Sequence, residues 1–194
     1  SYGFSLKEII KDGFRVDEKI FSSLDGYNNF TTAKSLGVLL QSLVDTIQRL
    51  KPTWLILAGD RGETMISAIA GGYTSTPIAH IQAGELSGIV DGQARHAIGK
   101  FANLHFASNK DAALRLKKLG EEKFRIKIVG APQLDDLYSK KFDYNNILHF
   151  KEKYNLNLNK NYFLVVYHPP QEKIESINKN FKVLFNFFKK TNFK

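Results

Sequence analysis

One segment of the chain, HIQAGELSGIVDGQARHAIGK at 80–100, gathers residue types that suit acid–base chemistry on a charged ligand. Glu85 stands between two glycines, Gly84 and Gly88, and glycine permits positive φ and close backbone approach. A carboxylate placed within hydrogen-bonding reach of a substrate proton serves as a general acid or base. The segment therefore predicts a loop that wraps a ligand and presents Glu85 to it.

Asp91 and Arg95 are four residues apart, so a helix would place them on one face. Asp91 falls near the predicted helix start, where the helix dipole favours an anion. Two interpretations stay open: a surface ion pair worth a few tenths of a kcal/mol, or a carboxylate and a guanidinium aimed into a cleft. His96 lies about 100° around the helix from Arg95, and we predict a structural role for it.

The elements that must position these residues form a repeated unit of apolar strand, turn and amphipathic helix. Strands are predicted at 54–58, 77–81, 104–107 and 125–129, and helices at 31–50, 64–72, 91–101 and 133–138. A further helix is predicted from the N-cap Ser108 to near Gly120, with Asp111 at its third position. Strands apolar on both sides, alternating with helices, predict an α/β fold: a Rossmann-like parallel sheet covered on both faces.

Ligands of an open parallel sheet bind outside the carboxyl ends of its strands. Polar residues stand at those ends: Asp60 and Arg61 after the first strand, 80–85 around the end of the second, and His168 after a strand predicted at 162–167. Each one alone is explained equally well as turn chemistry. Their gathering at one edge favours a ligand site.

The chain is predicted to hold one domain and the start of another. We place a Rossmann-like domain at 1–140 without its first strand and helix, and an interdomain connection at 141–160, where clean periodicity is lacking. The strand at 162–167 and a helix at 174–188 then begin a C-terminal nucleotide-binding domain at 161–194. Because the chain starts with Ser1 and stops inside an amphipathic segment, we expect a fragment.

Composition excludes several classes of function. The net charge is +9, but residues 141–194 hold ten Lys against four acids, and these charges are scattered and include no Arg. A nucleic-acid surface favours clustered Arg among aromatics, so we predict no nucleic-acid partner. No cysteine is present for a disulfide or a thiolate metal site. No apolar run approaches the roughly 20 residues of a membrane span, which predicts a cytoplasmic protein without a membrane partner.

Several motifs in register resemble the UDP-N-acetylglucosamine 2-epimerase family. They are LAGDRGE at 57–63, HIQAGELSG at 80–88, VDGQARHAIGK at 90–100, HFAS at 105–108, VGAPQLDDL at 129–137 and YHP at 167–169. Within the family they resemble the hydrolysing branch, which makes precursors of sialic and legionaminic acids. The resemblance implies a two-domain fold of the GT-B type, with the active site between two Rossmann-like halves.

The resemblance also implies a mechanism. Family members remove the C2 proton of the sugar, eliminate the nucleoside diphosphate and add water with inversion at C2. By motif position Asp60, Glu85 and Asp91 match catalytic carboxylates, and His168 matches a histidine that faces the cleft. Asp91 matches the first acid of a pair, but Gly92 stands in the second place, which puts a second acid in doubt and points to a different sugar nucleotide.

Further residues at the same edge are implied to bind the substrate. They are Arg61, His80, Gln82, Gly84, Ser87 and Arg95. The resemblance implies a nucleotide-sugar partner and a homodimer, and the elimination requires neither a cofactor nor a metal.

Three alternatives stay open. The substrate is UDP-N-acetylglucosamine or a GDP-linked diacetamido-trideoxy sugar. A GT-B glycosyltransferase would share the fold but would not need Glu85 and Asp91 together, and a noncatalytic nucleotide-sugar-binding module would keep the fold without a competent base. Because the predicted fragment lacks most of its second domain, we expect it to be inactive by itself.

Overall fold

The computed structural model describes residues 6–25, 28–88, 90–139, 144–157, 164–166 and 174–190. The chain divides into two compact units, Ser1–Leu137 and Tyr138–Lys194, and each is described by itself.

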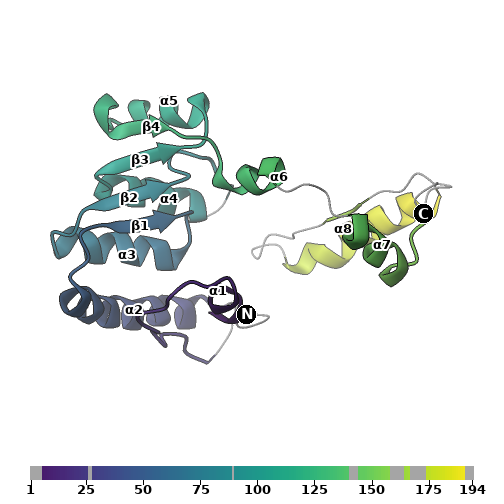
Figure 1. Cartoon of the computed structure of the whole chain (residues 1–194), viewed down its shortest axis with the longest axis horizontal. Coiled ribbons are helices and arrows are strands. Elements are labelled where there is room, and N and C mark those ends of the chain that lie inside the picture. Colours follow the sequence, from purple (N-terminus) through teal and green to yellow (C-terminus); the bar gives the residue numbers. More distant parts are fainter. Residues whose placement is uncertain are drawn as a thin grey trace. The chain divides into compact units, whose positions relative to one another are not determined.

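The first unit is built on a four-stranded parallel sheet whose strands all point the same way (Figure 1). The strands lie in chain order: β1 (Leu55–Ala58), β2 (Ile78–Ile81), β3 (Leu104–Ala107) and β4 (Ile126–Ile128). The helices that connect them are α3 (Gly62–Tyr73), α4 (Val90–Phe101) and α5 (Lys110–Lys118). The predicted strands and helices are thus confirmed, with small shifts at their ends.

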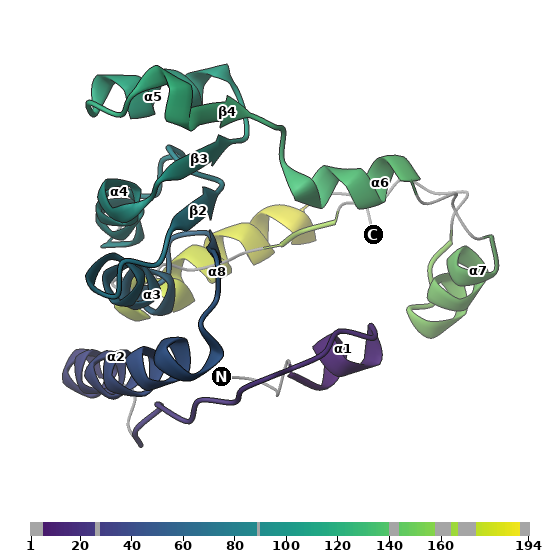
Figure 2. The same ribbon diagram turned by 60° about the vertical axis from the view of Figure 1, so that its left-hand side comes forward.

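All three connecting helices lie on one face of the sheet (Figure 2). Each crossover moves to the next strand in the same direction, and right-handed crossovers in one direction place their helices on one side. The prediction that both faces are covered is wrong for the described residues. On the other face the side chain of Ile56 is 69% exposed, and Ala58 is exposed as well.

The core fills the space between the sheet and these helices. Its larger cluster is Leu57, Ala68, Ile78, Ile98 and Ala102, and its smaller one is Ala83, Ala107, Ala112 and Leu116. Small residues let the layers approach: a Cβ at position 71 of α3 would lie 2.8 Å from Leu55 Cδ1. This close packing fixes the strand ends relative to the helices that follow them.

Two further helices precede the sheet, α1 (Leu6–Lys11) and α2 (Asn29–Leu50). The side chain of Asn28 caps α2 by accepting a hydrogen bond from the Thr31 amide, and α2 packs against α3. At the start of α5 the cap is Asn109, whose side chain accepts from the Ala112 amide. The prediction of Ser108 as this N-cap, with Asp111 third in the helix, is therefore wrong by one residue.

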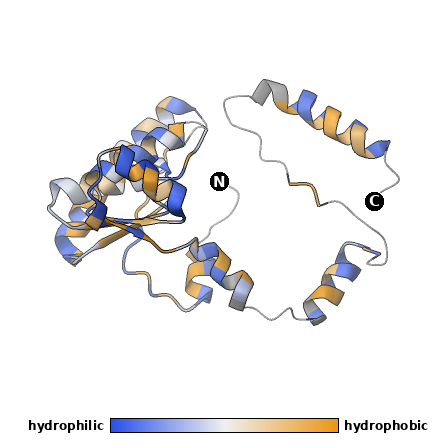
Figure 3. Cartoon of the chain, turned by 90° about the horizontal axis from the view of Figure 1, so that it is seen from above, coloured by the Kyte–Doolittle hydropathy of each residue, from blue (hydrophilic) through white to orange (hydrophobic). Residues whose placement is uncertain are grey.

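Beyond α5 the chain forms η1 (Lys123–Arg125), β4, η2 (Pro132–Leu134) and α6 (Asp135–Ser139). The second unit holds α7 (Tyr144–Lys153) and α8 (Ile174–Lys189), and apolar and polar residues alternate along α8 (Figure 3). The helix predicted at 174–188 is confirmed, while α7 lies inside the predicted connection. Of the strand predicted at 162–167 only 164–166 are described, and these form no strand. The predicted domain limits remain predictions.

Across the described ranges, every helix is too short or too polar to cross a membrane.

Two histidines are buried side by side in the sheet. His80 of β2 and His105 of β3 are paired in register, and both side chains are 0% exposed. Burial lowers the pKa of His80 to about 4, although its hydrogen bond to the Gly59 carbonyl favours the protonated ring. Burial also lowers the pKa of His105, against the opposing charge of Glu121. Both rings are therefore neutral near pH 7.

Acid should destabilise the chain through these rings. The unfolded His80 has a pKa near 6.5 and the folded one about 4, so the unfolded state binds more protons between these values. The stabilisation that the neutral His80 ring contributes is complete above pH 6.5, and it is lost as the pH falls toward about 4. We expect a loss of about 2 kcal/mol from His80 between pH 7.5 and 5.

Urea unfolding at both pH values checks this. His80→Gln keeps a donor for Gly59 but does not titrate, so its stability should fall less between pH 7.5 and 5 than that of the wild type. An equal fall in both proteins would contradict the account.

Candidate active site

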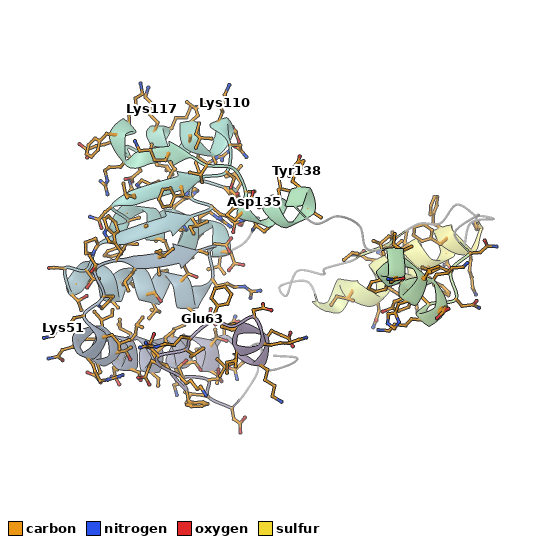
Figure 4. All side chains as sticks on the ribbon, in the orientation of Figure 1. Lys51, Glu63, Lys110, Lys117, Asp135 and Tyr138 are labelled. Atoms are coloured by element: carbon orange, nitrogen blue, oxygen red, sulfur yellow. The ribbon has the colours of Figure 1, made fainter. Side chains whose placement is uncertain are left out.

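The predicted site residues meet at the carboxyl edge of the sheet. Asp60 follows β1, the loop 82–87 follows β2, and Ser108 follows β3. Glu63, in the first turn of α3, lies near this edge in Figure 4, whereas Lys51 lies at the opposite end of the unit. The topology therefore brings together residues far apart in the chain.

Asp60 is held in a tight turn. Gly59 adopts a φ of +83°, which favours glycine, and its carbonyl accepts a hydrogen bond from His80 Nε2 at 2.8 Å. Asp60 Oδ2 accepts from Ser87 Oγ at 2.6 Å and from Arg95 Nη2 at 2.5 Å. The carboxylate is thus fixed by donors from the next loop and from α4.

These contacts lower the pKa of Asp60. Partial burial by itself would raise the pKa of Asp60, because burial disfavours the ionised form. The hydrogen bonds from Ser87 and Arg95 and the charges of Arg95 and Arg61 outweigh it, and the pKa is lowered below the ordinary value. Asp60 is therefore ionised at neutral pH, the state in which a carboxylate can accept a proton.

Arg95 joins the two catalytic candidates. Its side chain is 7% exposed, and besides Asp60 its guanidinium lies 3.7 Å from Glu85 Oε2 and donates to the Gln82 carbonyl at 2.6 Å. Across the described part of the chain Asp91 forms no ion pair, so the surface pair between Asp91 and Arg95 is not formed. Arg95 instead orients two carboxylates from two different loops.

Glu85 is held on its other side from the turn between β3 and α5. Its Oε1 accepts a hydrogen bond from Ser108 Oγ, and its side chain is 30% exposed. The preceding Gly84 has a φ of +77°, and a Cβ there would lie 2.4 Å from the Ala112 carbonyl oxygen. The Gly84 carbonyl accepts from Arg115 Nη1 at 2.6 Å, which ties the loop to α5.

The remaining predicted residues occupy different positions around this group. Arg61 is exposed at the N-cap of α3, whereas His80 is buried behind the Asp60 turn and contacts Gly59. Gln82 has a left-handed φ of 60°, with its carbonyl bound by Arg95. Asp91 is half-buried in the first turn of α4. His168 lies outside the described residues.

Gly92 stands where the family resemblance leads one to expect a second acid. A Cβ at this position would lie 2.5 Å from the Ser87 carbonyl oxygen, far closer than real Cβ contacts allow. The glycine therefore lets the loop that carries Ser87 approach α4. Any side chain at 92 would push Ser87 away from Asp60.

Gly92→Ala should destabilise the chain by about 1–3 kcal/mol, as overpacking does. Gly37→Ala is the matched control: this glycine is exposed in α2, and a Cβ there meets nothing within 4 Å. The control should gain up to about 1 kcal/mol, the usual effect of alanine in a helix. Denaturant unfolding of both variants measures the difference. If Gly92→Ala stabilises the chain as much as Gly37→Ala does, the result would contradict the close approach of the Ser87 carbonyl oxygen to position 92.

Sequence reasoning missed two residues of this group. The sequence predicts Ser108 as a helix cap, although its place directly after a strand is the same signal that points to Asp60. Arg115 lies in mid-helix, four residues after Asp111, and its spacing predicts only a local pair. That pair exists at 2.7 Å, but the same guanidinium also binds the Gly84 carbonyl.

The geometry suits proton transfer. Two carboxylates, one of them held ionised, share one buried cation and face the edge where an open α/β sheet binds its ligands. Within the described ranges no three His, Asp or Glu side chains are grouped to hold a metal ion. The fold and site define a Rossmann-like unit with two carboxylates joined by one buried arginine.

Comparison with known proteins assigns the family. The model of the UDP-N-acetylglucosamine 2-epimerase family matches residues 2–193, and the chain belongs to this family. It is 33% identical to a UDP-N,N'-diacetylbacillosamine 2-epimerase (hydrolyzing) of Legionella pneumophila, over 93% of this chain and 48% of the relative. It is 30% identical to a GDP/UDP-N,N'-diacetylbacillosamine 2-epimerase (hydrolyzing) of Campylobacter jejuni, over 94% of this chain and 47% of the relative.

A solved structure agrees on the fold. The UDP-GlcNAc 2-epimerase of Neisseria meningitidis, bound to UDP-GlcNAc, matches with a TM-score of 0.79 at 18% identity, over 97% of this chain and 53% of that one. The predicted fold class, of the GT-B type, is thereby confirmed. The chain spans about half the length of the curated relatives that it matches.

Proposed function

We propose that this chain is the first half of a two-domain nucleotide-sugar 2-epimerase of the hydrolysing type. The observation that carries the proposal is the group in which Arg95 bridges Asp60 and Glu85 at the carboxyl edge of the sheet. Family membership and the names of the relatives support the same activity. In the proposed two-domain protein, this chain is joined to such a second half.

The reaction requires a base and an acid at the sugar ring. One carboxylate takes the C2 proton while the bond from C1 to the diphosphate oxygen breaks, which leaves a C1–C2 double bond and the free nucleotide. A proton then returns to C2 from the opposite face, and hydroxide from water adds to C1. Asp60, held ionised by Ser87 and Arg95, suits the role of base, and Glu85 suits the second transfer.

The other predicted residues extend this proposal. Asp91, at the start of α4, is proposed as a further catalytic carboxylate, and His168 as a contribution from the second domain. Arg61 is exposed beside Asp60 and is proposed to meet the diphosphate. Gln82, Gly84 and Ser87 are proposed to lie against the substrate, and His80, which is buried, to act only through the turn that it supports. The segment 161–194 is proposed to open the nucleotide-binding domain.

The substrate is proposed to be UDP-N-acetylglucosamine or a UDP- or GDP-linked diacetamido-trideoxy sugar, as the names of the relatives indicate. The latter would supply legionaminic acid synthesis, and the former sialic acid synthesis. The cytoplasmic location, the homodimer and the absence of a nucleic-acid partner stay predictions.

Incubation of the two-domain protein with each sugar nucleotide in deuterated water tests the proposal. Epimerisation places deuterium at C2 of a free sugar with inverted configuration. Glycosyl transfer or binding alone would leave C2 protiated and would overturn the proposed reaction.

Asp60→Asn and Glu85→Gln should each lower kcat by about 10²-fold or more, because each removes a positioned acid or base. Asp45→Asn, at an exposed site on α2, is the matched control and should keep wild-type turnover. Turnover is measured by nucleotide release, with folding checked by circular dichroism. A correctly folded Asp60→Asn enzyme with normal kcat would remove Asp60 from the mechanism.

A further inference from the structure

The hydroxyl of Ser108 is committed to Glu85. Ser108 directly follows β3, is half-buried, and its Oγ donates a hydrogen bond to Glu85 Oε1. The N-terminus of α5 does not need this hydroxyl, because Asn109 Oδ1 accepts from the Ala112 amide at 2.9 Å. Two polar residues at the end of β3 thus have separate tasks, one for the helix and one for the carboxylate.

The position of the Glu85 carboxylate depends on one hydrogen-bond donor, whereas Asp60 has two. Asp60 accepts two hydrogen bonds of normal length or shorter, from Ser87 and Arg95. The nearest approach of Arg95 to Glu85 is 3.7 Å, an ion pair beyond hydrogen-bonding distance. Among the described residues Ser108 is therefore the direct donor to Glu85.

The protein encloses the side chain of Glu85 only in part. Its backbone follows Gly84 at positive φ, its side chain is 30% exposed, and the next residue, Leu86, is 69% exposed. If the hydrogen bond from Ser108 were lost, the ion pair with Arg95 at 3.7 Å would be the polar contact left to orient the carboxylate among the described residues. A carboxylate that transfers protons must be held within about 1 Å of its productive place, since such a misplacement costs about 10²-fold.

We propose that Ser108 is a positioning residue for Glu85, fixing its carboxylate through Oε1 and leaving Oε2 toward Arg95 and the reacting proton. Ser108 itself is not placed in contact with the substrate. This inference rests on the proposed function, because positioning matters only if Glu85 moves a proton at the sugar.

Two variants of the two-domain protein separate the hydroxyl from the rest of the side chain. Ser108→Ala removes the donor, and Ser108→Thr keeps it. With the sugar nucleotide that the wild type turns over, Ser108→Ala should lower kcat by about 10-fold or more, as expected for a lost hydrogen bond to a charged group. KM should stay within about 3-fold, and Ser108→Thr should restore kcat to within about 3-fold.

Ser67→Ala is the matched control. Its hydroxyl donates back to the Glu63 carbonyl within α3 at 2.8 Å, so its loss should leave kcat unchanged. The double variant Ser108→Ala with Glu85→Gln should lose less than the product of the two single losses, because groups that serve one step act as a unit.

Three results overturn the role of Ser108: a wild-type kcat in Ser108→Ala, an equal loss in the Ala and Thr variants, or fully multiplicative losses in the double variant. Each would leave the proposed function standing, because wild-type turnover and its loss in Asp60→Asn are measured in the same series. Absence of C2 epimerisation by the wild type would overturn the proposed function and, with it, the task assigned to Ser108.

Discussion

The structure of the candidate site depends on one buried cation. A guanidinium that is 7% exposed has lost most of its hydration, and such a charge is tolerated only when it is paired and hydrogen-bonded. Arg95 meets this requirement with the Asp60 carboxylate, the Glu85 carboxylate and the Gln82 carbonyl. The turn after β1, the loop after β2 and α4 are therefore fixed to one another, and the same contact helps to lower the pKa of Asp60.

The backbone around Arg95 is shaped so that these partners reach it. Gly59 and Gly84 take positive φ in the two turns, and Gly92 lets the Ser87 loop lie against α4. His80, neutral and buried, supports the first turn from inside the sheet through the Gly59 carbonyl. The polar group at the edge and the apolar core beneath it are thus parts of one packing arrangement. A substitution in the apolar core should therefore also disturb the polar group, and the reverse.

Much of the fold could be predicted from the sequence because short apolar runs alternate with helical periodicity. The strand ends then identified Asp60 and Glu85, since parallel strands place their carboxyl ends at one edge. The partner of Arg95 could not be predicted, because spacing along a helix reports only local neighbours such as Asp91. Ser108 had the right place after a strand, but a serine there fits a helix cap equally well. The helices cover one face of the sheet because the strands lie in chain order. The apolar pattern of each strand does not report this order, so the sequence could not predict which faces are covered.

The most direct test of this account is the coupling free energy between Asp60 and Arg95, measured by a double-mutant cycle of urea unfolding with Asp60→Asn and Arg95→Gln. A buried pair should show a coupling of about 2 kcal/mol or more, because either single change leaves an unpaired buried group. The pair of Asp111 with Arg115 on α5, with Asp111 76% exposed, is the matched control and should show less than about 1 kcal/mol. A coupling of Asp60 with Arg95 no larger than that of the control would contradict the account.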